Sequence, residues 1–311
     1  MKISIIGGGG LVGSSAGFAL QAKNVGREIA LIDVNQELAA GHALDLQHGS
    51  PSMANQRFVS GSYEHIPDSD LICITAGLRR QPGESRLDLI NRNTGLFVSI
   101  LENVAQAGTK DSAIVLVVSN PVDILTYVAA QKLNLPTSQI IGLGTQLDTI
   151  RFQSLLAEHL SVQPQQVNAL ILGEHGDSMV PIWSSATIAG LPLEKFPGWS
   201  TNDSQKIFDR TKGSGAEVIS RKGGAGFAVG VAIADVCEAV FENSNVLLPV
   251  SSYQDGSCYD IRDVSLSVPT VIGRSGVVDK LELELWSKEM QSLKNGARLL
   301  RQTLDKVLAG I

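Results

Sequence analysis

The first half of the chain alternates short apolar runs, rich in β-branched residues, with segments of helical pattern. The apolar runs are continuous, which is typical of strands that are buried on both faces of a sheet. Strands are expected at 2–6, 28–34, 70–77, 113–120 and 139–144, and helices at 13–23, 36–49, 84–107 and 122–132. Strands and helices in this alternation build a parallel sheet covered by helices on both sides. We therefore predict a doubly wound α/β domain over residues 1–142.

The pattern changes after about Gly142. A long helical segment over 147–160 precedes strand-like runs whose spacing indicates antiparallel pairing, at 168–173, 245–253 and 263–273. Near the C-terminus, larger apolar residues recur at alternating steps of four and three, at Trp286, Met290, Leu293, Ala297, Leu300 and Leu304. This spacing predicts an amphipathic helix. We expect a second, α+β domain over residues 143–311 that carries the substrate site, with a cleft between the two domains.

Composition narrows the class of protein. The 311 residues are 43% hydrophobic and 18% charged, as in a globular enzyme. A net charge of −6 argues against a nucleic-acid partner, so any bound anion requires locally placed cations.

The cysteines and the N-terminal run bear on location. Cys73, Cys237 and Cys258 lack CxxC spacing, which favours buried thiols in a reducing compartment. The apolar N-terminal run is interrupted by the glycines Gly7–Gly10, unlike a signal peptide, and no run reaches the length of a membrane helix. We expect a cytoplasmic protein without membrane association.

The run GGGGLVG, residues 7–13, contains a dinucleotide-binding fingerprint. Gly8, Gly10 and Gly13 satisfy GxGxxG, directly after an expected strand and before an expected helix. Glycines at these positions allow a tight turn and let the backbone approach a pyrophosphate at the helix N-terminus. The frame that starts at Gly7 fails because its third glycine would fall at Val12, and a P-loop fails because Ser14 replaces its lysine. The fingerprint predicts a Rossmann-type domain.

Asp33 identifies the expected cofactor. It ends the next expected strand, 20 residues after Gly13, where a carboxylate can accept hydrogen bonds from the adenosine ribose. The same carboxylate would repel the 2′-phosphate of NADP, and no arginine follows it. NAD is therefore the expected cofactor.

His175 is the strongest candidate for acid–base chemistry. It lies in the polar loop LGEHGDSMV, and Asp148 and Arg151 stand three residues apart on the helix before it. The spacing leaves open whether these residues form a site, or whether His175 is a surface histidine and the other two are a simple ion pair. The remaining histidines have no partners at metal-ligand spacing, so no metal site is expected.

Taken in order, these motifs resemble the lactate/malate dehydrogenase family over essentially the whole chain. The resemblance rests on GGGGLVG with Asp33, GLRRQPGESR (77–86), VSNPVDILTY (118–127), LDTIRF (147–152) and LGEHGDS (172–178). It implies that His175 exchanges a proton with the substrate, with Asp148 as its partner. Arg151 would bind the substrate carboxylate, and Asn120 would donate to the reacting oxygen.

The resemblance also implies a lid from about Gly77, which brings Arg86 down to polarise the carbonyl. Asn93, Val118 and Asn120 complete the expected cofactor-binding set. Proton exchange at neutral pH suits histidine, and the arginine and the amide stabilise charge on the carbonyl oxygen. A homodimer or homotetramer is the assembly that the family resemblance implies.

The expected substrate follows from two positions. Arg80 occupies the place at which this family carries glutamine in lactate dehydrogenases and arginine in malate dehydrogenases, and Ala225 replaces their usual threonine. An inward-facing Arg80 would favour a second carboxylate. We therefore expect a malate dehydrogenase of the tricarboxylic acid cycle. The alternative is an L-lactate dehydrogenase or an enzyme that accepts both acids, since Glu84, GEHGDS and VSNPVDILTY are more lactate-like.

Three further hypotheses complete the sequence-based view. Gln153 and Asn168 replace the arginine and histidine of lactate dehydrogenases activated by fructose 1,6-bisphosphate, so no such activation is expected. An NAD-dependent glycosidase would want a cysteine and a histidine around a metal, and His175 has no nearby cysteine. A cofactor-sensing protein without turnover would not need His175, Asp148, Arg151 and Arg86 together.

Overall fold

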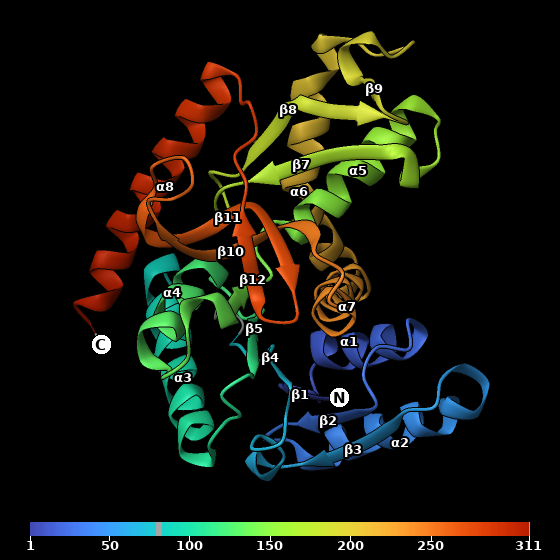
Figure 1. The fold of residues 1–311 in the computed structure, drawn as a ribbon, viewed down its shortest axis with the longest axis vertical. Helices are drawn as coiled ribbons and strands as arrows, with labels where there is room; N and C mark the ends of the chain where they lie inside the picture. Colours follow the sequence, from blue (N-terminus) through green and yellow to red (C-terminus); the bar gives the residue numbers. More distant parts are fainter. Residues whose placement is uncertain (79–82, 311) are drawn as a thin grey trace.

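The computed structural model describes residues 1–78 and 83–310. Its main feature is a nine-stranded sheet of order β12-β11-β10-β6-β5-β4-β1-β2-β3 (Figure 1). Six of these strands are parallel and come from the first half of the chain: β1 (Lys2–Ile6), β2 (Glu28–Ile32), β3 (Arg57–Gly61), β4 (Leu71–Ile74), β5 (Ile114–Val117) and β6 (Ile140–Gly142). The predicted parallel sheet is confirmed.

The second half extends the same sheet. The hairpin of β10 (Val246–Asp255) and β11 (Arg262–Gly273) is antiparallel, as the spacing predicted, and β12 (Gly276–Lys280) continues it. β10 joins β6 through the pair Ser251 and Gly142. A smaller sheet contains β7 (Val167–Leu172), β8 (Val180–Ile188) and β9 (Leu191–Pro192). The two halves of the chain are therefore connected through hydrogen-bonded strands as well as through packed side chains.

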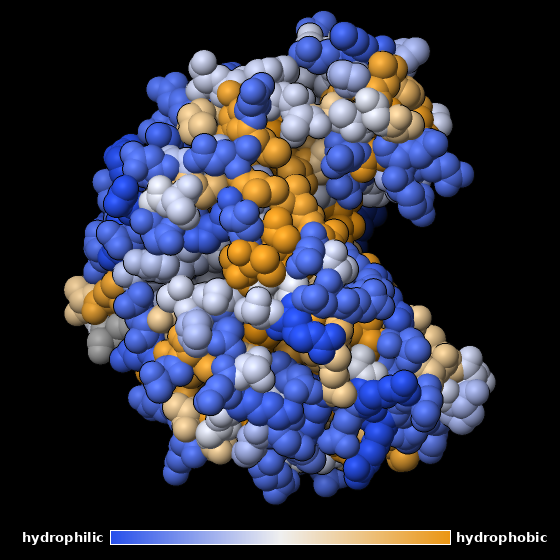
Figure 2. All heavy atoms as spheres, viewed as in Figure 1, coloured by the Kyte–Doolittle hydropathy of each residue, from blue (hydrophilic) through white to orange (hydrophobic). Residues whose placement is uncertain are grey.

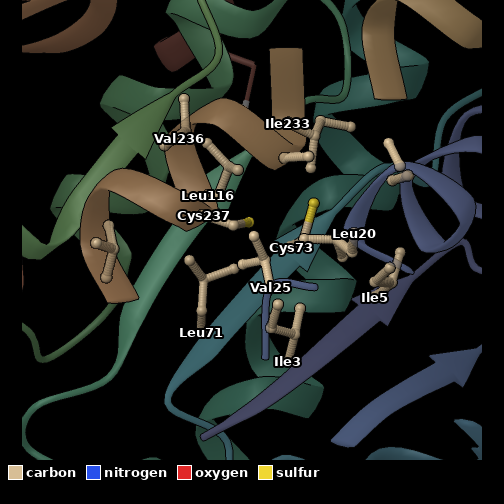
Figure 3. Close-up of a cluster of buried hydrophobic side chains, with 14 of the residues drawn as sticks. Ile3, Ile5, Leu20, Val25, Leu71, Cys73, Leu116, Ile233, Val236 and Cys237 are labelled. Atoms are coloured by element: carbon tan, nitrogen blue, oxygen red, sulfur yellow. The ribbon is translucent and has the colours of Figure 1, made fainter. Parts of the chain in front are cut away.

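Alternate residues of the buried strands point to opposite faces of the parallel sheet. Leu71 and Cys73 point to one face, and Ile72 and Ile74 to the other, as the two-residue period of a strand requires. One face is covered by α1 (Leu11–Ala22), α2 (Gln36–Met53) and α7 (Phe227–Glu242), and the other by α3 (Arg86–Ala107) and α4 (Val122–Lys132). Figure 3 shows Ile233, Val236 and Cys237 of α7 packed towards the strand residues. A helix from the second half thus completes the core of the first.

The remaining helices surround the second half: α5 (Gln146–Leu160), α6 (Ser204–Lys222) and α8 (Ser287–Leu308). The predicted C-terminal amphipathic helix is α8. Its apolar stripe buries Leu293, Ala297, Leu300 and Leu304, whereas Trp286 lies at the N-cap and is exposed. Figure 2 shows the molecule indented between the lobe that contains β7–β9 and the lobe that contains α1 and α2.

The three cysteines are buried and unpaired, as expected from their spacing. Within the described part of the chain, no helix combines the length and apolar character that crossing a membrane would need.

Candidate active site

The glycine-rich turn lies between β1 and α1, where the fingerprint placed it. A Cβ on Gly13 would lie 2.3 Å from the carbonyl oxygen of Gly7, and one on Gly8 would lie 2.8 Å from Cα of Leu31. The N-cap of α1 is Gly10, and no side chain caps its free N–H groups. Close backbone approach and uncapped N–H groups at a helix start suit a pyrophosphate. The turn therefore fits a dinucleotide.

Gly7, which the sequence analysis set aside in favour of Gly8, is also a part of this turn. Its φ of +91° lies in the left-handed region, and a Cβ there would come within 2.6 Å of the backbone nitrogen of Ala76. Gly7 belongs to no complete GxGxxG frame, but the run of four glycines was a signal that more than three positions need glycine.

Asp33 lies directly after β2 and faces the glycine turn. Its Oδ2 accepts a hydrogen bond from the backbone nitrogen of Gly9 at 3.0 Å, and its Oδ1 accepts one from the backbone nitrogen of Asn35 at 2.9 Å. These bonds fix the carboxylate beside the turn. A fixed carboxylate at this place suits the two ribose hydroxyls of NAD and opposes a 2′-phosphate.

His175 and Asp148 meet although they lie 27 residues apart. Nδ1 of His175 is 2.5 Å from Oδ2 of Asp148, which is fully buried on the first turn of α5. The His175 side chain keeps 22% of its surface exposed, so Nε2 is the ring nitrogen left for an external group. A carboxylate that accepts from Nδ1 fixes the ring and its tautomer, as required of a histidine that exchanges protons at Nε2.

The charges of this cluster stabilise the imidazolium. Burial alone would lower the pKa of His175, but the negative charge and hydrogen bond of Asp148 outweigh burial and raise that pKa above its ordinary value. Burial opposes ionisation of Asp148 as well, yet His175 and Arg151 hold the pKa of Asp148 below its ordinary value. The pair is therefore poised to hold a proton on the ring near neutral pH.

Arg151 lies on the same helix and keeps 15% of its side chain exposed. Nη1 is 3.3 Å from Oδ1 of Asp148, so the ion pair considered from the sequence does form. The guanidinium also lies beside Gly215 of α6, where an added Cβ would be 3.4 Å from Nη1. A small residue there leaves room beside the planar fork, which is suited to bind a carboxylate.

The other predicted site residues lie after β5, within α3 and just before α7. Val118 follows β5, and Asn120 is exposed two residues later, with its Oδ1 3.3 Å from the backbone nitrogen of Val122. Asn93 is buried. Its Oδ1 accepts the backbone N–H of Leu78 at 2.7 Å, and its Nδ2 donates to the carbonyl oxygen of Leu78 at 3.3 Å. Asn93 thus fixes the segment after β4. Ala225 is half-buried just before α7 and packs against the same core as α1.

Two predicted residues are not brought into this geometry. Arg80 lies outside the described residues, and of Arg86 only the backbone, which begins α3, is described. No cluster of three metal-ligating side chains occurs within residues 1–78 and 83–310.

Asp123 is the site residue that the sequence reasoning passed over. It lies in the first turn of α4, buried to 3% exposure, and its Oδ2 accepts the backbone N–H of His175 at 2.8 Å. A charged residue inside the apolar run VDILTYVAA was the available signal, because such a residue is rarely buried without a partner.

The chain belongs to the lactate/malate dehydrogenase family. Residues 1–142 match the model of the family's NAD-binding domain, and residues 145–311 match its α/β C-terminal domain. The protein is thus an NAD-dependent oxidoreductase of this family, which acts on small 2-hydroxy acids. The family, the Rossmann fold and the NAD cofactor predicted from the sequence are confirmed.

Individual relatives are similar over nearly their full length. The chain is 40% identical to L-lactate dehydrogenase 1 of Clostridium acetobutylicum, with 98% of each chain covered, and 40% identical to L-lactate dehydrogenase of a Synechococcus species, with 99% covered. Among solved structures, the ligand-bound minor L-lactate dehydrogenase of Enterococcus mundtii matches with a TM-score of 0.93, 38% identity and 98% of each chain covered. A lactate dehydrogenase from a deep-sea metagenome matches with a TM-score of 0.93, 34% identity and 98% of each chain covered.

These comparisons correct the expected substrate. Malate dehydrogenase, and with it the tricarboxylic acid cycle, is wrong as the main prediction, because relatives similar over the whole chain are lactate dehydrogenases. The error came from giving two positions, Arg80 and Ala225, more weight than the rest of the sequence. An arginine side chain is long and well solvated, so its presence in a loop does not require a second carboxylate in the pocket.

Proposed function

We propose that the protein is an NAD-dependent L-lactate dehydrogenase that interconverts pyruvate and L-lactate. The observation that carries the proposal is the contact of His175 Nδ1 with the buried Asp148, beside Arg151 on the same helix. The lactate dehydrogenases described above, similar over 98% or more of this chain, support the choice of acid.

Each of these residues has a separate task in the proposed reaction. Arg151 binds the pyruvate carboxylate through its planar fork and orients the carbonyl. His175 donates a proton from Nε2 to the carbonyl oxygen during reduction and takes it back during oxidation. Asp148 keeps the ring aligned and balances the charge of the imidazolium. Asn120, exposed at the end of β5, is the proposed donor to the reacting oxygen.

The cofactor site is proposed to combine the glycine turn with the strand ends. Gly8, Gly10 and Gly13 let the backbone approach the pyrophosphate, Asp33 accepts from the ribose, and Val118 and Asn120 line the nicotinamide end. When bound, NAD supplies the hydride acceptor for lactate or the donor for pyruvate. Asn93 acts through Leu78, whose backbone it holds, rather than by a direct contact.

Several expectations stay predictions. These are the division into domains at residues 142 and 143, the homodimer or homotetramer, and the cytoplasmic location. Arg86 as the carbonyl-polarising arginine and the lack of fructose 1,6-bisphosphate activation belong with them. Gln153 and Asn168 are the two positions on which the last of these predictions rests, and Gln153 donates to the carbonyl of Ala169, next to Asn168, at 3.0 Å.

The test compares NADH oxidation with pyruvate and with oxaloacetate at equal low concentrations. We expect the larger kcat/KM with pyruvate, and in the reverse direction NAD reduction with L-lactate but not with D-lactate. A larger kcat/KM with oxaloacetate would refute the proposal.

A further inference from the structure

Asp123 occupies an unusual place for a carboxylate. It is 3% exposed at the start of α4, a helix that packs against β10 and β11 of the large sheet. No lysine, arginine or histidine side chain among the described residues forms an ion pair with it. A buried acid without a cationic side chain as partner is costly, and such residues often have a function.

The two oxygens of the Asp123 carboxylate have different surroundings. Oδ2 accepts the backbone N–H of His175 at 2.8 Å. Oδ1 is buried without a hydrogen-bond partner among the described residues, and the buried hydroxyl of Ser251 on β10 is likewise unpaired there. The Ser251 hydroxyl nevertheless lies close enough to lower the pKa of Asp123, although it does not reach full hydrogen-bond geometry. Asp123 therefore connects the loop of His175 to α4, beside Ser251 of the central sheet.

Two carboxylates thus bind the same histidine from different elements. Asp148 of α5 contacts the ring, whereas Asp123 of α4 holds the backbone of the residue. Arg151 on α5 also acts on the imidazole, and Glu174, in the same loop as His175, acts on Asp123. Asn120, three residues before Asp123, belongs to the same segment, so one short stretch places both the expected oxygen contact and the anchor of the histidine.

We propose that Asp123 is a positioning residue for His175, which anchors the histidine loop through the backbone N–H and adds a second negative charge behind the imidazolium. The inference rests on the proposed function, because it concerns the group that exchanges the proton. Asp123 has no contact with substrate in this role. It acts through His175 alone.

The charge of Asp123 determines the direction in which the pKa of His175 should shift when that charge is removed. The charge of Asp123 adds to that of Asp148 in raising the pKa of His175. Burial raises the pKa of Asp123 itself to about 7, against the bond from His175, so its charge develops in the working range of pH. Pyruvate reduction needs the imidazolium and is lost as pH rises through the pKa of His175. Removing the charge of Asp123 therefore moves this loss to lower pH, and moves the onset of lactate oxidation to lower pH as well.

Two variants separate the anchor from the charge. Asp123→Asn keeps an oxygen that accepts from His175 but removes the charge, whereas Asp123→Ala removes both. We expect Asp123→Asn to lower the pKa in the kcat/KM profile for pyruvate by about one unit while kcat at pH 6 stays within about threefold of the wild-type value. Asp123→Ala is expected to lower that kcat by about tenfold in addition, because the loop loses its anchor.

The ring titration of His175, followed by NMR on histidine-labelled protein, measures the same shift without substrate. The matched control is Glu289→Gln. Glu289 is also a buried carboxylate that accepts backbone N–H groups, from Trp183 at 2.7 Å and Ser184 at 3.1 Å, but it joins α8 to β8. We expect Glu289→Gln to lower the melting temperature and leave the titration of His175 unchanged.

The outcomes are distinct. An unchanged pKa of His175 in Asp123→Asn overturns the proposal, and so does an Asp123→Ala protein that loses only thermal stability, as Glu289→Gln does. If Asp123→Ala fails to fold, Asp123→Asn alone decides. If the wild type does not reduce pyruvate, the proposed function fails, while the NMR titration still tests Asp123.

Discussion

The glycine turn after β1 and the histidine cluster at the junction of α4 and α5 solve different problems by different means. The turn acts through shape: an added Cβ at Gly13 would lie 2.3 Å from the oxygen of Gly7, and no side chain caps α1. The cluster acts through charge: Asp148, Asp123 and Arg151 come from two helices and converge on one histidine loop. The shape of the glycine turn is therefore encoded locally, whereas the histidine cluster needs α4 of the first half to pack against α5 and the His175 loop of the second half.

Gly13→Ala tests the glycine turn by adding a methyl group where the backbone is closely packed. The new methyl group meets backbone atoms that have no room to move, so we expect a loss of about 3 kcal/mol in the free energy of unfolding and weaker NADH binding. Chemical denaturation and NADH fluorescence titration measure both effects.

Gly41→Ala is the matched control, since Gly41 lies within α2 with nothing within 4 Å of an added Cβ. It should stabilise the protein by about 0.5 to 1 kcal/mol. Equal effects of the two substitutions would remove the argument from close approach.

Arg151→Lys tests the histidine cluster. It keeps the positive charge at position 151 but removes the planar guanidinium. A lysine cannot present two parallel N–H groups to a carboxylate, so kcat/KM for pyruvate should fall by about 10- to 100-fold. NADH binding should stay the same. Arg210→Lys, at an exposed arginine paired with Glu158 on the surface, is the control and should retain wild-type kinetics. Equal kinetics of Arg151→Lys and wild type would exclude Arg151 as the carboxylate anchor.

The pH dependence of stability sharpens the comparison through the free energy of unfolding alone. Folding raises the pKa of Asp123 from 3.8 to about 7 by burial, so its contribution to stability is present below pH 4 and is lost as pH rises towards 7. Asp123→Asn lacks this loss, so its free energy of unfolding should rise relative to that of wild type as pH increases from 4 to 7. Urea denaturation at several pH values measures the difference, and a difference that does not change with pH would contradict the assignment.

The sequence predicted what is local and periodic. The parallel strands, the turn with Asp33 and the helix that carries Asp148 and Arg151 follow from short patterns. The contact of Asp148 with His175 needed the family resemblance, because spacing along the chain does not place α5 against the loop after β7. The role of Asp123 was not predicted because its partner is a backbone N–H 52 residues away. Every residue type except proline carries such a group, so the sequence does not indicate the contact. The expected malate specificity failed because it rested on side chains whose direction the sequence does not fix.

The central claim is that His175 gives the proton while pyruvate accepts a hydride from NADH. The direct measurement is reduction of pyruvate with NADH that carries deuterium at both C4 positions, in wild type and in His175→Gln at equal NADH occupancy, with lactate analysed by mass spectrometry. We predict L-lactate with deuterium at C2 from wild type, and a rate lower by about 10³-fold from His175→Gln. Lactate without deuterium, or a His175→Gln rate close to that of wild type, would contradict the claim.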